Sequence, residues 1–168
     1  MEAYWEIPAS AKTAVKGRWQ PAPGDALFQA LTAEFGALPL VAEDLGIITP
    51  EVEKLRDDHG LPGMKVLHFA FGGGADNPYL PHNHIVNSVV YTGTHDNNTT
   101  LGWFNELDQP TRAHLFDYLG GGQEQMPGLL VRAAFASVAR LAVVPLQDVR
   151  AVGGEHRMNQ PGVANGCW

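Results

Sequence analysis

Four short apolar segments divide the chain, and each of them leads into a polar cluster. They comprise residues 38–42, 64–71, 88–91 and 141–145. The apolar residues within them are nearly continuous rather than alternating with polar ones, which is typical of parallel strands buried on both faces. We therefore expect four buried strands.

Amphipathic helices are predicted between these strands. The clearest one begins at Pro50, because Thr49 is a good N-cap residue and proline is favoured at the first helical position. It is expected to end near His59 and Gly60. Further helices are expected over residues 25–35, 98–107, 109–119 and 127–140.

The order of these elements is typical of α/β proteins. Both a doubly wound parallel sheet and part of a (β/α)₈ barrel fit it. In both architectures the functional side chains follow the carboxyl ends of the strands, which is where the polar clusters of this chain lie. The pattern alone does not separate the two folds.

Composition and charge exclude several classes of protein. The chain has 168 residues, of which 45% are hydrophobic, as expected for a globular domain and not for a disordered tail. Its net charge of −7 argues against a nucleic-acid partner, which requires a basic surface. No apolar run reaches the ~18 residues of a membrane span. A single cysteine, Cys167, and the lack of a signal-peptide pattern predict a cytoplasmic protein.

The first polar cluster contains Glu43 and Asp44, directly after the predicted strand 38–42. Adjacent residues on a strand point to opposite faces, so only one of the two carboxylates is expected to enter a site. A carboxylate at this position could act as a general acid. It could equally cap the following turn or meet solvent, and the pattern leaves both interpretations open.

The longest polar cluster, YTGTHDNNTT, occupies residues 91–100. Asn98 or Thr99 is expected to cap the following helix, but capping does not require so long a polar run. His95 and Asp96 carry hydrogen-bonding groups that suit a polyhydroxylated or phosphorylated ligand. We therefore expect a binding site in this loop.

Three further segments contain candidate chemistry. DNPYLPHNH (76–84) places His82, Asn83 and His84 in a proline-stiffened loop that could contact a sugar. These histidines and His95 also suggest a metal site, but no cysteine or carboxylate completes a ligand set at the usual spacing. PLQD (145–148) and RMNQPG (157–162) are either binding loops or simple turns.

Taken together and in order, these segments resemble the 4-α-glucanotransferases, also called amylomaltases or disproportionating enzymes. The residues that carry the resemblance are EAYWEIPA (2–9), GRWQPAPG (17–24), VAEDLGIITPEVEKLRDDHGLPGMKVL (41–67), NPYLPHNH (77–84), NSVVYTGTHDNNTTLGWF (87–104), PLQD (145–148) and RMNQPG (157–162). Their spacing matches as well as their residues, and they cover essentially the whole chain.

The resemblance implies a fold. The family has a (β/α)₈ TIM barrel of the α-amylase-like type, and residues 1–168 would supply about its fifth to eighth strands with their helices. A complete barrel takes about 250 residues. We therefore expect the chain to be the C-terminal part of a catalytic barrel, truncated at both ends.

The resemblance also implies an activity, the transfer of α-1,4-glucan segments between maltodextrins by retaining double displacement. An aspartate forms a covalent glucosyl-enzyme, a glutamate protonates the leaving oxygen, and a second aspartate holds sugar hydroxyls in the transition state. By motif, Glu43 corresponds to the acid/base and Asp96 to the stabilising aspartate. His95, Asn159 and His82 correspond to substrate contacts.

The implied partners are α-1,4-glucans, namely maltodextrins and oligosaccharides derived from glycogen or starch. No cofactor, metal ion, nucleic acid or membrane is implied. Asp44 would then be a structural residue.

One catalytic group of the family is missing from these residues. The nucleophilic aspartate lies in an RIDHFRG-type motif just before the EAYWEIP segment, and no such motif occurs in the chain. We therefore expect the chain alone to be inactive, and the open edges of a half-barrel to favour self-association. The alternative is a non-catalytic α-glucan-binding or remnant polypeptide.

Overall fold

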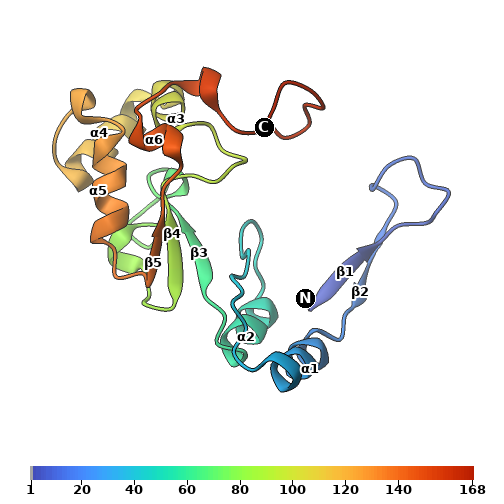
Figure 1. Ribbon diagram of the computed structural model, residues 1–168. Coiled ribbons are helices and arrows are strands. Elements are labelled where there is room, and N and C mark those ends of the chain that lie inside the picture. Colours follow the sequence, from blue (N-terminus) through green and yellow to red (C-terminus); the bar gives the residue numbers. More distant parts are fainter. Residues whose placement is uncertain (1) are drawn as a thin grey trace. The chain divides into compact units, whose positions relative to one another are not determined.

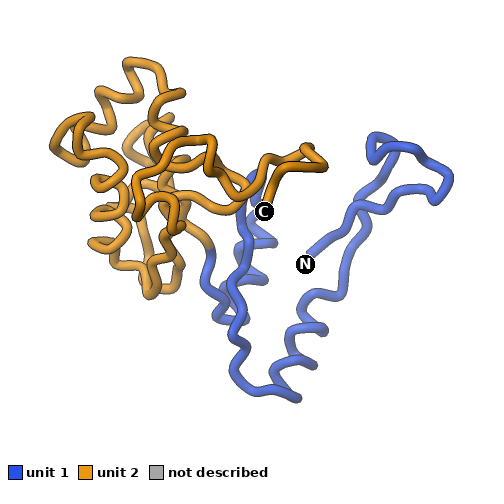
Figure 2. The backbone as a smooth tube through the Cα atoms, turned by 45° about the horizontal axis from the view of Figure 1, so that its top comes forward, with its two compact units in different colours: residues 1–63 blue, residues 64–168 orange. Residues whose placement is uncertain are grey.

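The computed structural model describes residues 2–168. The chain forms two compact units, Met1–Gly63 and Met64–Trp168 (Figure 2). Each unit contains a small sheet and helices (Figure 1). The structure is therefore a mixed α/β fold, which confirms the predicted class.

The first unit contains an antiparallel hairpin that the sequence pattern did not predict. Strand β1 (Ala3–Glu6) pairs with β2 (Arg18–Pro21), and Trp5 lies opposite Trp19 in the register. The two indole rings meet edge to face with their centroids 5.2 Å apart. Both strands are short and largely exposed, so neither shows the continuous apolar run by which buried strands are identified.

Two helices follow the hairpin. Helix α1 spans Gly24–Phe35 and helix α2 spans Pro50–Asp58. As predicted, Thr49 caps α2, and its Oγ1 accepts a hydrogen bond from the backbone N–H of Val52 at 3.4 Å. The chain leaves α2 through Gly60, whose φ of 62° lies in the left-handed region.

The strand predicted over residues 38–42 is wrong. These residues belong to no strand or helix, although the N–H of Ala42 donates to the carbonyl of Pro62 at 2.8 Å. A strand needs a ladder of such bonds to a neighbouring strand. Among the described residues of this unit, only β1 and β2 form a sheet. Leu40 and Val41 consequently remain 42% and 44% exposed.

A three-stranded sheet leads into the second unit, with the order β3-β4-β5 (Figure 1). Its strands are β3 (Gly63–Val66), β4 (Ser88–Tyr91) and β5 (Leu141–Val143). Strand β4 has the predicted bounds and runs parallel to β5. The other two strands are shorter than predicted, and after β3 the chain turns at once into the 3-10 helix η1 (Leu67–Phe69).

Helices of the second unit follow the predicted positions. Helix α4 has the predicted bounds, whereas α3 and α5 are shorter, and the four-residue helix α6 was not predicted. Helix α3 begins only at residue 100 because Thr99 is its N-cap, with its Oγ1 accepting from the N–H of Gly102 at 3.1 Å. The bounds are α3 (Thr100–Glu106), α4 (Gln109–Leu119), α5 (Gly128–Ala136), α6 (Leu146–Val149), and the 3-10 helices η2 (Pro81–Asn83), η3 (Gln123–Gln125) and η4 (Gly154–His156).

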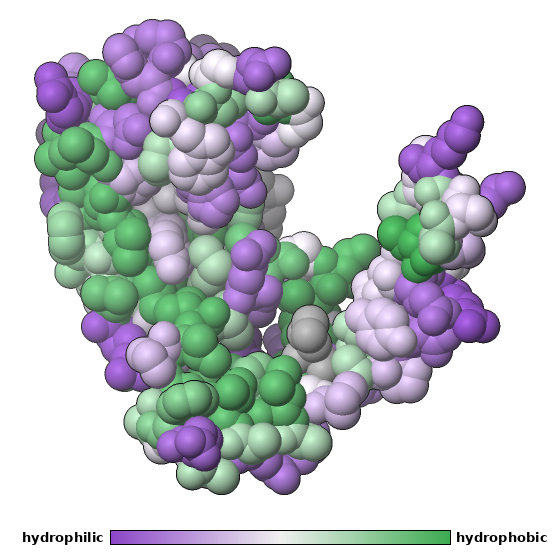
Figure 3. Space-filling model, turned by 45° about the vertical axis from the view of Figure 1, so that its right-hand side comes forward, coloured by the Kyte–Doolittle hydropathy of each residue, from purple (hydrophilic) through white to green (hydrophobic). Residues whose placement is uncertain are grey.

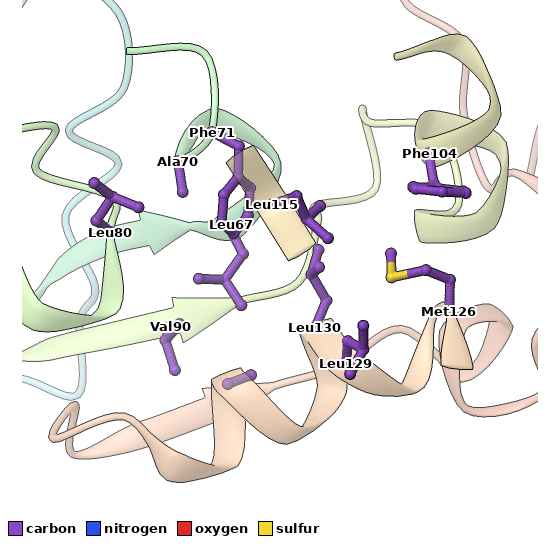
Figure 4. Packing of buried hydrophobic residues seen from close by; sticks show 11 residues of the cluster. Leu67, Ala70, Phe71, Leu80, Val90, Phe104, Leu115, Met126, Leu129 and Leu130 are labelled. Atoms are coloured by element: carbon purple, nitrogen blue, oxygen red, sulfur yellow. The ribbon is translucent and has the colours of Figure 1, made fainter. Parts of the chain in front are cut away.

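The core of the second unit joins the sheet to its helices (Figure 4). Val90 of β4, Leu67 of η1, Leu115 of α4 and Leu130 of α5 are all 0% exposed and belong to one cluster. Burying each such side chain contributes about 2 kcal/mol. This core holds the strand ends from which the polar loops begin.

Apolar side chains also gather at the surface (Figure 3). In the second unit they come largely from α5, β5, α6 and the turns between them, and each is more than a third exposed: Phe135, Val138, Leu141, Val143, Leu146 and Val149. Over residues 2–168, no helix combines the length and the apolar character that crossing a membrane requires.

Candidate active site

The loop between β4 and α3 carries His95 and Asp96. Its backbone is held by a turn in which the Oδ1 of Asn97 accepts from both the N–H and the hydroxyl of Thr94, each at 2.8 Å. Such side-chain bonds satisfy backbone polar groups without regular secondary structure. The side chains of His95 and Asp96 are 53% and 52% exposed, so a ligand can reach them.

The structure brings three of the five predicted site residues together at Asp96. The Nδ2 of Asn159 donates to Asp96 Oδ1 at 2.7 Å, and His95 Nε2 lies 3.4 Å from the same oxygen. Arg157 completes the arrangement, since its Nη2 donates to the backbone carbonyl of Asp96 at 3.0 Å and its Nε to that of Asn159 at 2.7 Å. The predicted loop RMNQPG therefore orients Asp96, and Arg157 is a residue whose role the sequence pattern did not reveal.

Glu43 lies in the first unit, in the segment that precedes α2, and is exposed. It lines a pocket of about 910 Å³ whose walls are mostly apolar and include Trp19, Phe28 and Val41. The pocket therefore places aromatic and aliphatic surface beside the Glu43 carboxylate.

The neighbouring Asp44 has a structural contact, as expected. Its side chain is 6% exposed and pairs with the side chain of Arg56, which is 13% exposed, with Oδ2 and Nη1 2.5 Å apart. Hydrogen bonds to Asp57 and Asp44 raise the pKa of Arg56 despite partial burial, so this group stays charged. A Cβ atom at Gly63 would lie 2.2 Å from Asp44 Oδ2, so the pair also requires glycine there.

Both ring nitrogens of His82 are engaged within its own neighbourhood. Nε2 lies 2.8 Å from the carbonyl of Ala75, which can only accept, so this nitrogen carries the proton. Nδ1 then accepts from the hydroxyl of Tyr118 at 2.7 Å, and that hydroxyl accepts from the backbone N–H of His82 at 3.1 Å. These bonds order the DNPYLPHNH loop, and a contact between His82 and substrate stays a prediction.

His84, one of the histidines that suggested a metal site, also has hydrogen-bond partners within the protein. His84 Nδ1 lies 2.7 Å from Ser137 Oγ, and its Nε2 lies 2.9 Å from the carbonyl of Tyr79. Across residues 2–168, no three side chains of His, Cys, Asp or Glu lie close enough together to hold a metal ion.

Comparison with known proteins identifies the family. The family model for 4-alpha-glucanotransferase matches residues 1–168. The chain is 55% identical to the 4-alpha-glucanotransferase of Thermus thermophilus over 175 residues, which is 99% of this chain and 35% of that relative. It is 48% identical to the chloroplastic/amyloplastic 4-alpha-glucanotransferase DPE1 of Arabidopsis thaliana, over 98% of this chain and 29% of that relative.

Solved structures agree with these relatives. The amylomaltase of Streptococcus agalactiae in complex with acarbose matches 99% of this chain and 34% of its own, with a TM-score of 0.91 and 34% identity. The amylomaltase of Corynebacterium glutamicum, at 19% identity and a TM-score of 0.71, supports the fold alone. The chain thus spans about a third of the length of the proteins that it matches. By its sequence and its structure, it belongs to the 4-alpha-glucanotransferase family.

Proposed function

We propose that this chain is part of the catalytic barrel of an enzyme that transfers α-1,4-glucan segments between maltodextrins. The family match over the whole chain and a related amylomaltase in complex with acarbose support a glucan substrate. The observation that carries the proposal is the solvent-accessible Asp96 beside His95, whose carboxylate accepts from Asn159 and whose backbone carbonyl accepts from Arg157. The sheet β3-β4-β5 would supply about the last three of the four barrel strands expected from the sequence.

Each candidate residue has a role in a retaining double displacement. Glu43 protonates the leaving glycosidic oxygen and later removes the proton from the acceptor hydroxyl. Asp96 accepts hydrogen bonds from sugar hydroxyls, which strengthen as positive charge develops on the ring. His95 and Asn159 border the same carboxylate and contact the sugar, and His82 contributes from its own loop.

Residues 1–168 alone do not complete this mechanism. The covalent step needs a nucleophilic aspartate, and the RIDHFRG-type motif that carries it in the family does not occur among them. Losing one member of a catalytic set usually removes most of the rate. We therefore expect the 168-residue polypeptide by itself to leave maltotriose unchanged.

A chimeric enzyme tests the roles, with residues 1–168 replacing the matching segment of the Thermus thermophilus relative. It should convert maltotriose into glucose and longer maltodextrins. Glu43→Gln and Asp96→Asn should each lower turnover by at least about a hundredfold. Asp117→Asn, at an exposed position of α4, is the matched control and should have no effect. Near-normal turnover of either active-site variant rejects the role assigned to it.

The isolated polypeptide distinguishes the alternative function. Robust turnover of maltotriose by it would contradict the proposed inactivity. Calorimetric titration with a maltodextrin then separates a glucan-binding polypeptide, which releases or takes up heat in a saturable way, from a remnant that does not bind.

We also infer that the isolated polypeptide self-associates. Strand β5 is an end strand of the sheet, and its Leu141 and Val143 are 52% and 38% exposed. An exposed apolar edge strand favours pairing with another chain. Sedimentation velocity over a range of concentrations should show oligomers, and Leu141→Lys should reduce them. A monomer at all concentrations contradicts this inference.

A further inference from the structure

A buried carboxylate connects both ends of the loop that carries His95 and Asp96. It belongs to Asp148, which lies in α6 shortly after β5 and is 3% exposed. Its Oδ2 accepts from the hydroxyl of Thr92 at 2.5 Å and from that of Thr100 at 2.7 Å, while its Oδ1 accepts from the N–H of Thr100 at 2.7 Å. Thr92 follows β4 and Thr100 begins α3, so the two threonines bracket the loop.

The end of β3 joins the same cluster through His68. The backbone N–H of His68 donates to the carbonyl of Thr92 at 3.2 Å, and its Nε2 lies 2.9 Å from the hydroxyl oxygen of Thr100. Because that hydroxyl donates its own proton to Asp148, it accepts from Nε2. The imidazole also stacks on Trp103 of α3, with ring centroids 4.5 Å apart and planes 6° from parallel. The carboxyl-end loops of all three strands therefore meet here.

The cluster requires a carboxylate at position 148. An ionised carboxylate only accepts hydrogen bonds, and here it meets three donors from Thr92 and Thr100. Both threonines are 0% exposed, so no solvent replaces a lost partner. An asparagine has almost the same shape, but its amide group would face two hydroxyl donors with further donors.

We propose that Asp148 is a positioning residue that holds the His95–Asp96 loop at both ends. It acts through Thr92 and Thr100, and so sets the orientation in which Asp96 meets the reacting sugar. The catalytic consequence rests on the proposed glucan transfer, whereas the restraint on the loop does not.

Kinetics of the chimeric enzyme test the catalytic consequence. Asp148→Asn should lower kcat about 10- to 100-fold with KM changed less than about threefold, because a displaced catalytic group slows the chemical step. Thr100→Val should lower kcat similarly, and Thr100→Ser, which keeps the hydroxyl, should restore it. Asp117→Asn is again the control. If both Asp148→Asn and Thr100→Val retain kcat within twofold, Asp148 is not a positioning residue.

Should Asp148→Asn fail to fold, the pair Thr92→Val and Thr92→Ser gives the same comparison with a smaller perturbation. A lowered kcat in Thr92→Val that Thr92→Ser restores supports the proposal. Equal kcat values in these two variants overturn it.

Hydrogen exchange in the isolated 168-residue chain and in its Asp148→Asn variant tests the restraint on the loop independently of activity. Asp148→Asn should speed amide exchange of Thr100, Asp96 and Asn97 at least about tenfold, while the core amide of Leu130 stays slow. Unchanged exchange of these three amides overturns the proposed restraint. If the chimera with the wild-type segment is inactive, the proposed function is refuted. If Asp148→Asn nevertheless speeds exchange in the loop, the restraint is still supported.

Discussion

Acidification should destabilise the second unit, in large part through His68. This residue is 7% exposed, and burial lowers its pKa from 6.5 to about 4, although the nearby carboxylate of Asp148 opposes this effect. Within residues 2–168 no group hydrogen-bonds to its Nδ1, so a proton added there would be buried without an acceptor. The neutral imidazole is therefore the form that the folded unit accommodates.

The size of the effect follows from the two pKa values. Between pH 6.5 and about 4 the unfolded chain binds a proton that the folded chain does not, so the free energy of unfolding falls as the pH falls through this window. At about 1.4 kcal/mol for each pK unit, the difference between 6.5 and about 4 gives a loss of about 3 kcal/mol. The loss from this residue is complete below about pH 4 and absent above about pH 7.

Urea unfolding at pH 7, 6, 5 and 4 measures this loss when it is followed through NMR signals of second-unit core amides. The comparison is with His68→Gln, since glutamine can still donate to Thr100 but does not titrate. His84, whose pKa is also lowered by burial, is present in both proteins, so its contribution cancels in the difference. If the gap in stability between the two proteins changes by less than about 1 kcal/mol from pH 7 to pH 4, the argument from burial is refuted.

Three further substitutions have expected effects on stability. Asp44→Ala leaves the largely buried side chain of Arg56 without this partner, and should destabilise the first unit by about 3 kcal/mol in urea unfolding followed through NMR signals of first-unit amides; an unchanged midpoint contradicts this. Thr99→Ala removes the N-cap of α3 and should cost about 1 kcal/mol by the same titration on second-unit amides, whereas Thr99→Ser should cost little. Gly93→Ala places a Cβ atom 2.6 Å from Cε1 of the buried His68 ring, and should cost about 1–3 kcal/mol and shift the NMR signals of that ring; a wild-type spectrum refutes it.

Local chemistry explains why parts of the fold were predictable from the sequence. The start of α2 depends on Thr49 and Pro50, which are favoured as N-cap and first helical residue, and the structure has them in these places. Strand β4 is buried along most of its length, so its apolar run matches its bounds, Ser88–Tyr91. Prediction failed where the apolar pattern did not coincide with strand pairing. Residues 38–42 are apolar, but among the described residues of the first unit no strand pairs with them, while β1 and β2 form because they pair with each other.

The candidate site was likewise only partly predictable from the sequence. The sequence by itself determined which residues are candidates for the site, since His95 and Asp96 stand out as a polar run between a buried strand and a helix, and their motif resembles a known family. Only the tertiary structure decided how they are held, because Asn159 lies 63 residues from Asp96 and Asp148 lies 48 residues from Thr100. Hydrogen bonds between such distant residues depend on the parallel pairing of β4 and β5, which brings the carboxyl ends of both strands to one edge of the sheet.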